Sequence, residues 1–201
     1  MATPEQQADT IPSLSEIIPP HSEILISSEQ IRRRVEELGK QISHDYAGKN
    51  PIFLCTLKGG FIFFADLVRN LDLQILGKFE IGFLRASSYV GQTSTQELKL
   101  IPTFDLTILK DRDIIIAEDL IDSGFSAETL IKMAREDWQT QSVEMIVLLF
   151  KLTGRNANGL RPRYIGYEIP DFWVFGVGPD DGGLTPGDTS RCFPDIRYYP
   201  S

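Results

Sequence analysis

The 201-residue sequence predicts one α/β domain, with a central, mostly parallel, twisted sheet flanked by helices. Three apolar runs, at residues 51–57, 114–117 and 143–150, have the length and β-branched content of strands buried on both faces. Segments with helical periodicity follow the first two runs, an alternation typical of parallel sheets. Polar residues stand directly after each run, so we expect a ligand site at the carboxyl ends of these strands.

Composition limits the classes of function that remain. A net charge of −8 disfavours nucleic acid as a partner. No run of eighteen apolar residues exists, which predicts no membrane span. Residues 1–9 lack the basic and apolar regions of a secretory signal. Cys55 and Cys192 have no metal-ligand spacing, so we expect reduced thiols and a cytoplasmic protein.

The first part of the domain is expected to begin near residue 23. Residues 1–22 are rich in proline with little periodicity, which predicts a flexible leader, and residues 23–201 form the domain. Residues 23–26 favour a short strand, and Ser27 with Gln30 forms a capping-box pattern for a helix. That helix carries apolar residues at Ile31, Val35, Leu38 and Ile42. Its three arginines, residues 32–34, are a solvated face or an anion site.

The second strand, at residues 51–57, ends in Lys58, Gly59 and Gly60, and a helix begins at Phe61. Two glycines at such a turn can bring backbone N–H groups close to an anion. The alternative is a tight turn with a solvated lysine. A third strand is expected at residues 79–84, and residues 87–98 are polar and rich in small side chains. They indicate either a hairpin or, as we favour, a lid that closes over a site.

The segment at residues 113–127 is the centre of the prediction. The strand at 114–117 is followed by Glu118 and Asp119, then by Asp122, and then by a small polar loop, Ser123–Ser126, at a helix start. The carboxylates can accept hydrogen bonds from sugar hydroxyls or hold a hydrated Mg²⁺. The loop can direct backbone N–H groups at a phosphate. Taken singly, the acidic pair is also typical of a solvated loop, and the serines of a simple helix cap.

Two further features follow the strand at residues 143–150. Lys151 ends that strand, either as a surface cation or as part of the site. After a loop at 152–162, the segment at 164–176 carries Trp173, which is either a core residue or a stacking surface for an aromatic ligand.

The Glu118-Asp119 pair with Asp122-Ser123-Gly124 resembles the phosphoribosyl-diphosphate (PRPP) binding motif of the type I phosphoribosyltransferases, in the form found in the hypoxanthine-guanine branch. Residues 57–61 and 164–176 resemble two further motifs of that branch, in the expected order. The resemblance implies the type I phosphoribosyltransferase fold, with a small hood over the active site that residues 151–201 largely form. It also implies transfer of a phosphoribosyl group from PRPP to a 6-oxopurine in purine salvage.

The resemblance assigns roles residue by residue. Asp122 is the implied catalytic base. The residues implied to bind PRPP are Glu118, Asp119, Ser123, Gly124, Phe125 and Ser126. The residues implied to bind pyrophosphate are Lys58, Gly59 and Arg191. Those implied to bind the purine are Lys151, Trp173 and Val174. Ser88 and Tyr89 belong to the lid. Mg²⁺ is the implied cofactor, held by Glu118, Asp119 and Asp180, with Asp181 as the alternative to Asp180.

The family also implies a homodimer or homotetramer, and a cis peptide bond between Leu57 and Lys58. The C-terminal segment departs from the pattern, because residues 181–190 are longer and richer in glycine and proline than the family's connection to the arginine. Two other classes stay open. One is a PRPP- or nucleotide-sensing regulator on the same fold, and the other is a binding protein without catalysis.

Overall fold

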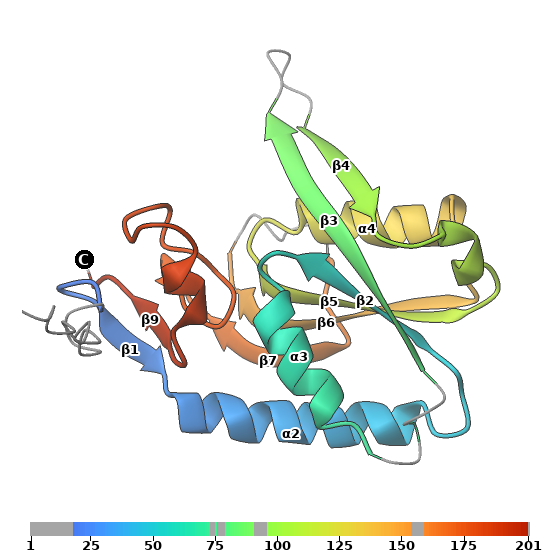
Figure 1. Ribbon diagram of the computed structural model, residues 1–201, viewed down its shortest axis with the longest axis horizontal. Coiled ribbons are helices and arrows are strands. Elements are labelled where there is room, and N and C mark those ends of the chain that lie inside the picture. Colours follow the sequence, from blue (N-terminus) through green and yellow to red (C-terminus); the bar gives the residue numbers. More distant parts are fainter. Residues whose placement is uncertain (1–17, 73–74, 76–78, 91–95, 154–158, 201) are drawn as a thin grey trace, which may run out of the picture.

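The computed structural model describes residues 18–72, 75, 79–90, 96–153 and 159–200. Its main sheet has six strands in the order β4-β3-β2-β5-β6-β7, and only the β3–β4 pair is antiparallel. The mostly parallel sheet predicted from the apolar runs is therefore confirmed (Figure 1). The strands are β2 (Ile52–Leu57), β3 (Glu80–Val90), β4 (Gln96–Pro102), β5 (Asp113–Ile121), β6 (Ser142–Lys151) and β7 (Tyr164–Ile169).

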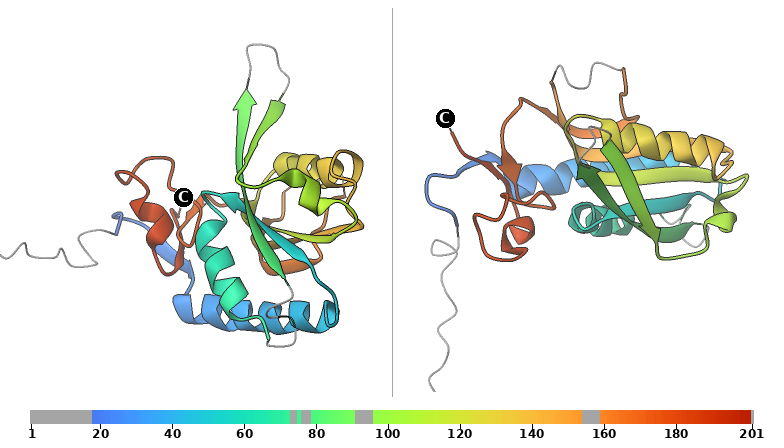
Figure 2. Two further views of the ribbon diagram at one scale, coloured as in Figure 1. Left: turned by 45° about the vertical axis from the view of Figure 1, so that its right-hand side comes forward. Right: turned by 90° about the horizontal axis from the view of Figure 1, so that it is seen from above.

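Helices cover both faces of this sheet, which explains the apolar runs. Helices α2 (Ser28–Asp45) and α3 (Phe61–Arg69) lie on one face, and α4 (Phe125–Glu136) lies on the other (Figure 2). Successive strand side chains point to opposite faces. Phe53 and Ile115 therefore pack in the core beneath α2 and α3, whereas Leu54 and Ile116 pack beneath α4. The described part of the chain also forms two short 3₁₀ helices, η1 (Leu106–Leu109) and η3 (Thr189–Cys192).

Helix α2 begins as its sequence predicts. The Ser27 hydroxyl accepts the backbone N–H of Gln30 at 3.3 Å, and the Gln30 side chain accepts the N–H of Ser27 at 2.9 Å. Such a capping box satisfies two N–H groups that the helix cannot pair internally. On the next turn Arg34 donates to the carbonyl oxygens of Ile165 and Gly166, at 2.8 and 3.0 Å. This arginine therefore ties α2 to the edge strand β7.

The polar segment predicted as a lid forms most of an antiparallel arm. Strand β3 continues past Leu84 to Val90 and pairs with β4, with Ser88 opposite Leu98 and Tyr89 opposite Glu97. The arm projects from the sheet (Figure 1). The third strand is thus longer than the predicted 79–84, because backbone pairing does not require apolar side chains. The tip, residues 91–95, lies outside the described residues.

A second sheet of three strands stands beside the carboxyl ends of the main sheet. Its order is β1-β9-β8, and both pairs are antiparallel. Strand β9 (Ile196–Tyr198) lies between β1 (Glu23–Ile26) and β8 (Val174–Phe175). Of the predicted leader, residues 1–17 lie outside the described part, and Ser22 accepts a hydrogen bond from Arg197 at 3.0 Å. In the parts of the chain that are described, no helix is long and apolar enough to cross a membrane.

Candidate active site

A cavity of about 340 Å³ opens at the carboxyl ends of β2 and β5. It has the size of a small-molecule site and the position at which open α/β sheets bind ligands. Three separate segments that the sequence singled out meet in its wall. The predicted site residues among its lining are Lys58, Gly59, Glu118, Asp119, Asp122, Ser123, Gly124, Ser126 and Arg191.

Two carboxylates with raised pKa values form one side of the cavity. Burial, and then the charge of Asp119, raise the pKa of Glu118 from 4.5 to about 8, although the Thr56 hydroxyl donates to its carboxylate. Burial raises the pKa of Asp119 from 3.8 to about 6, against the lowering effects of backbone N–H groups and the Arg191 charge. The ligand-free site therefore disfavours two negative charges at this acidic pair, because the surrounding groups compensate them only in part.

Backbone without side chains lies directly against Asp119. A Cβ atom on Gly59 would overlap the Asp119 carboxylate, and one on Gly178 would lie 2.5 Å from the Gly59 carbonyl oxygen and 2.7 Å from Cβ of Asp119. Gly178 also has a φ of +129°, which side chains rarely tolerate. The peptide bond between Leu57 and Lys58 is cis, as the family resemblance implied. The turn after β2 thus brings its backbone into contact with the acidic pair.

The loop after β5 carries Asp122 and the start of α4. Gly124 is the cap residue of α4, with a φ of +84° and no side-chain cap hydrogen bond. The Ser123 hydroxyl accepts the Phe125 N–H at 3.4 Å, and Ser126 lines the cavity from the first turn. The serines therefore do not serve as the N-cap residue of α4. The helix N-terminus, with its unpaired N–H groups, begins at the cavity wall.

A lysine connects Asp122 to the second sheet. Lys151 Nζ lies 3.1 Å from Asp122 Oδ2 and 3.3 Å from Asp171 Oδ1, and only 6% of its side chain is exposed. The interpretation of Lys151 as a surface cation is therefore wrong. The ammonium group joins the loop after β5 to the segment that leads into β8.

Beyond Lys151, Trp173 and Val174 stand where the second sheet begins. Trp173 is 58% exposed, so it is not a core residue, while Val174 is buried in β8. Neither residue belongs to the lining of the 340 Å³ cavity. Gly182, in the glycine-rich segment, lies against the Trp173 ring: a Cβ there would be 3.0 Å from Cζ2.

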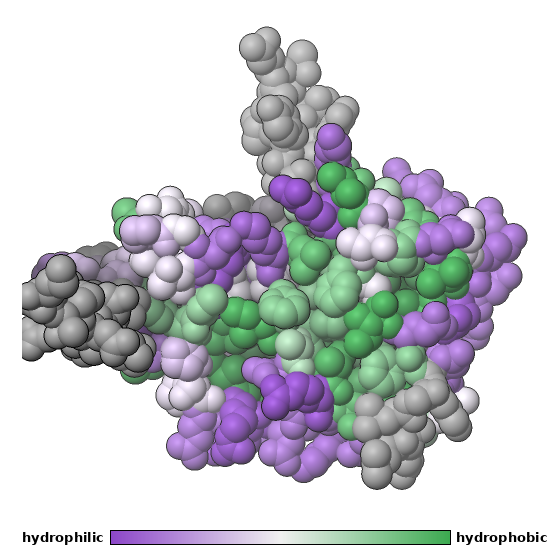
Figure 3. All heavy atoms as spheres, viewed as in Figure 1, coloured by the Kyte–Doolittle hydropathy of each residue, from purple (hydrophilic) through white to green (hydrophobic). Residues whose placement is uncertain are grey.

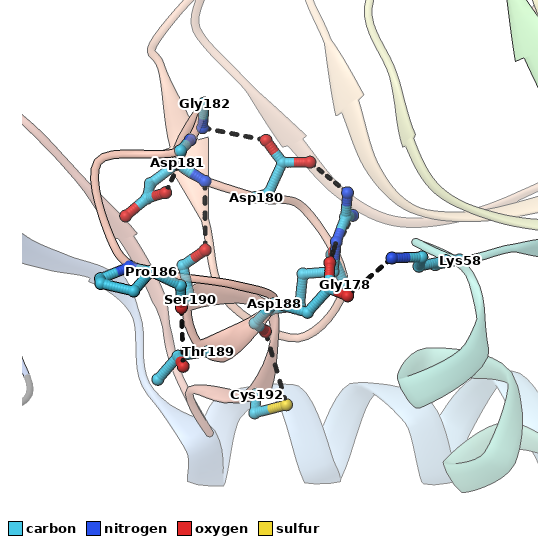
Figure 4. A network of polar contacts seen from close by, with 12 residues as sticks. Lys58, Gly178, Asp180, Asp181, Gly182, Pro186, Asp188, Thr189, Ser190 and Cys192 are labelled. Carbon is cyan, nitrogen blue, oxygen red and sulfur yellow. Dashed lines mark hydrogen bonds and ion pairs between the residues drawn. The ribbon is translucent and has the colours of Figure 1, made fainter.

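The segment at residues 178–192 forms a polar network beside the cavity (Figure 4). Asp180 pairs with the Arg191 guanidinium and is partly exposed. Asp181 is buried, and its carboxylate accepts the N–H groups of Gly183 and Thr185, at 3.2 and 2.8 Å. Asp180 also accepts the N–H of Gly182, at 2.9 Å, but its side chain is 41% exposed whereas Asp181 is buried, which favours Asp180 as the acid available to the site.

Three residues that sequence reasoning missed take part in the site. Thr56 donates to Glu118, Asp171 pairs with Lys151, and Asp188 pairs with both Lys58 and Arg191. Thr56 could have been recognised from the sequence, because it is a polar residue near the end of an otherwise apolar run. Nothing in the local sequence indicates the partners of the two aspartates, which come from distant segments.

Comparison with known proteins agrees with this geometry. The phosphoribosyl transferase domain family matches residues 21–184. Hypoxanthine-guanine phosphoribosyltransferase of Bacillus subtilis is 37% identical over 158 residues, which cover 78% of this chain and 84% of the relative. The chain belongs to the hypoxanthine-guanine branch of the phosphoribosyltransferase family. The Homo sapiens protein of the same name is 36% identical over 157 residues, covering 75% of this chain and 70% of the relative.

Solved structures of the branch share the fold. A crystal structure of a hypoxanthine-guanine phosphoribosyltransferase from Bacillus anthracis, with a HEPES molecule in its active site, superimposes with a TM-score of 0.75 at 33% identity. The match covers 88% of this chain and 97% of that structure. The predicted fold class and family are therefore confirmed, and the chain is an enzyme of the transferase class.

Proposed function

We propose that this phosphoribosyltransferase transfers the 5-phosphoribosyl group of PRPP to N9 of a 6-oxopurine: hypoxanthine, guanine or xanthine. The products are the nucleoside 5′-monophosphate and pyrophosphate, as in purine salvage. The observation that carries the proposal is the single cavity in which the acidic pair, the loop at Ser123–Ser126, the Lys58-Gly59 turn and Arg191 meet.

The ribose 5-phosphate half of PRPP fits the wall after β5. The N-terminus of α4 and the loop at residues 123–126 offer backbone N–H groups and hydroxyls to the 5′-phosphate. Glu118 and Asp119 lie at the neighbouring position, where carboxylates can accept the ribose 2′- and 3′-hydroxyls. Binding both ends of the sugar fixes the anomeric carbon, and such orientation lowers the barrier to reaction.

We assign the proton transfer to Asp122. N9 of the base attacks the anomeric carbon as the bond to pyrophosphate breaks, through an oxocarbenium-like state. Asp122 takes the proton from N7 as this attack proceeds. Lys151 would donate to the purine 6-oxo oxygen beside N7, which its distance of 3.1 Å from Asp122 supports. Trp173 would stack on the base, and the Val174 backbone would contact its edge.

The acidic pair fits a Mg²⁺ ion. Protein-bound Mg²⁺ keeps several waters and takes one or two carboxylates together with substrate phosphates. Glu118 and Asp119, whose pKa values are raised to about 8 and about 6, would gain from a cation, and Asp180 lies close to them. The ion would neutralise the charge that develops on the leaving pyrophosphate, a task to which Lys58, the Gly59 backbone and Arg191 also contribute. Within the described residues, no three His, Cys, Asp or Glu side chains lie close enough together to hold a metal ion by themselves.

Further parts of the proposal concern the surroundings of the site. We expect the arm that carries Ser88 and Tyr89 to close over bound PRPP and exclude water. We also expect a cytoplasmic homodimer or homotetramer. Apolar side chains gather on the face over α3 and β3 (Figure 3), where Phe61 and Ile81 are 52% and 46% exposed. Exposed apolar patches of this kind mark association surfaces, and light scattering of the purified protein would give the oligomeric state.

The test is steady-state turnover with PRPP and Mg²⁺ against hypoxanthine, guanine, xanthine and adenine in parallel. Turnover with a 6-oxopurine and not with adenine is the expected result. A protein that binds PRPP without turning over any base would instead be a sensor. The net charge of −8 and the family comparisons give that alternative no support.

A further inference from the structure

One carboxylate holds both of the basic side chains that we expect to meet pyrophosphate. Asp188 Oδ2 lies 2.7 Å from Lys58 Nζ, and Asp188 Oδ1 lies 3.2 Å from Arg191 Nε (Figure 4). Each oxygen thus takes one cation, as two oxygens of a phosphate group would. Hydrogen bonds from Lys58 and Arg191 lower the pKa of Asp188, so the carboxylate is ionised at neutral pH.

The position of Asp188 is built into the loop at residues 178–191. The Gly178 N–H donates to the Arg191 carbonyl oxygen at 3.1 Å, and the Arg191 guanidinium donates back to the Gly178 carbonyl oxygen at 2.7 Å. Inside this closed loop the buried Ser190 hydroxyl accepts the N–H of Asp181 at 3.3 Å. The Asp188 carbonyl oxygen accepts the Arg191 N–H at 3.2 Å. The backbone of Asp188 is therefore held, while its side chain is 54% exposed.

We propose that Asp188 is an internal competitor for the pyrophosphate group. Its carboxylate bridges Lys58 and Arg191 in the ligand-free enzyme, and PRPP or pyrophosphate displaces it on binding. Asp188 thereby weakens the affinity of the site for both ligands and favours release of the pyrophosphate product. This inference rests on the proposed function, because that function assigns Lys58 and Arg191 to pyrophosphate.

A positioning role would have the opposite consequence. If Asp188 held the two cations in a binding-competent arrangement, its removal would weaken pyrophosphate binding. The contacts favour competition. Arg191 is also held by Asp180 and by the Gly178 carbonyl oxygen, so its placement does not depend on Asp188 alone. Lys58 is 65% exposed, and an ion pair this exposed exchanges readily because solvent screens it.

The experiment is calorimetric titration of the full chain with inorganic pyrophosphate in the presence of Mg²⁺. Asp188→Asn keeps the shape of the side chain and removes its charge, so we expect pyrophosphate to bind roughly two- to thirty-fold more tightly, the range expected for losing two exposed ion pairs. Asp188→Glu restores the charge and should return the affinity toward that of the unchanged protein. Glu136→Gln removes an ion-paired carboxylate at the far end of α4 that is 64% exposed, against 54% for Asp188, and should leave the affinity unchanged.

Unchanged or weaker pyrophosphate binding by Asp188→Asn would overturn the proposal. An equal gain in pyrophosphate affinity in Glu136→Gln would also overturn it, because the gain would then come from the change in the net charge of the protein. Turnover of PRPP with each of hypoxanthine, guanine and xanthine is measured on the same unchanged protein. If turnover is present and Asp188→Asn gains no affinity, only the competitor role fails. If the protein has no turnover and none of the proteins binds pyrophosphate, the proposed function fails and this inference fails with it.

Discussion

The partly buried acidic pair makes the stability of the ligand-free enzyme depend on pH, and Glu118→Gln should remove much of that dependence. The pKa of Glu118 is raised from 4.5 to about 8. Between these values the folded state retains a proton that the unfolded state has released, so the free energy of unfolding falls as pH rises. The Thr56 hydroxyl can still donate to the amide oxygen that the substitution introduces.

The magnitude follows from the pKa shift. At 1.36 kcal/mol per pKa unit, raising the pKa from 4.5 to about 8 sets a ceiling of about 5 kcal/mol. Water in the open cavity screens part of this cost, so we expect the variant to be about 2 kcal/mol more stable than the unchanged protein at pH 8.5. At pH 4.5, where the carboxyl group is protonated in the folded state and half protonated in the unfolded state, the two proteins should differ little.

The assay is urea unfolding of both proteins from pH 4.5 to 8.5, without PRPP or Mg²⁺ and with Glu136→Gln as the control for loss of an exposed carboxylate. PRPP affinity is measured in parallel and should fall in Glu118→Gln, because the same carboxylate is assigned to the ribose. A stability difference that stays constant across this pH range, or a variant less stable at pH 8.5, would show that the folded structure does not raise the pKa of Glu118.

Three further substitutions probe the site. Asp122→Asn should lower turnover by about 10²–10⁴-fold, the usual contribution of a general base, while PRPP affinity measured by calorimetry stays nearly unchanged; unchanged turnover would remove Asp122 from its role. Gly59→Ala should displace the Asp119 carboxylate, which a Cβ atom would overlap, and so raise the KM for PRPP; an unchanged KM would show that the turn adapts. Trp173→Ala should raise the KM for the base by roughly 5- to 150-fold, equivalent to a stacking energy of about 1–3 kcal/mol, and Trp173→Phe should restore most of the affinity; equal losses in both variants would argue against stacking.

Features coded by local sequence were predictable from the residues alone. The β-branched residues at 114–116 indicate a strand buried on both faces, and the structure packs alternate side chains beneath α2 and α3 or beneath α4. Ser27 and Gln30 mark the start of α2 because a capping box depends only on residues three apart. The acidic pair followed by Asp122 also lies close together in the sequence, and the structure places all three residues in the wall of the cavity.

Features that depend on distant partners were not predictable. Residues 87–90 continue β3 because β4 pairs with them, and although a hairpin was one of the two interpretations of this segment, its own sequence does not show where the strands end or how they pair. The strand at 23–26 was recognised, but its partner at 196–198 lies almost the whole domain away. Asp188 looks like one more polar residue of a glycine-rich loop, and only the closure of that loop brings it to Lys58.

The three-stranded sheet also imposes an order on the folding of the chain during its synthesis. A ribosome makes β1 first and β9 last among the elements of the fold, and β9 is the strand that joins β1 to β8. Every strand of the main sheet and the whole of the loop at 123–126 have been translated before that joint can close. A growing chain can therefore shape the phosphate side of its pocket while the wall next to Trp173 still lacks a strand. Closing such a long loop is slow compared with local pairing, so we expect competence to bind the base to be the last property that a new molecule acquires.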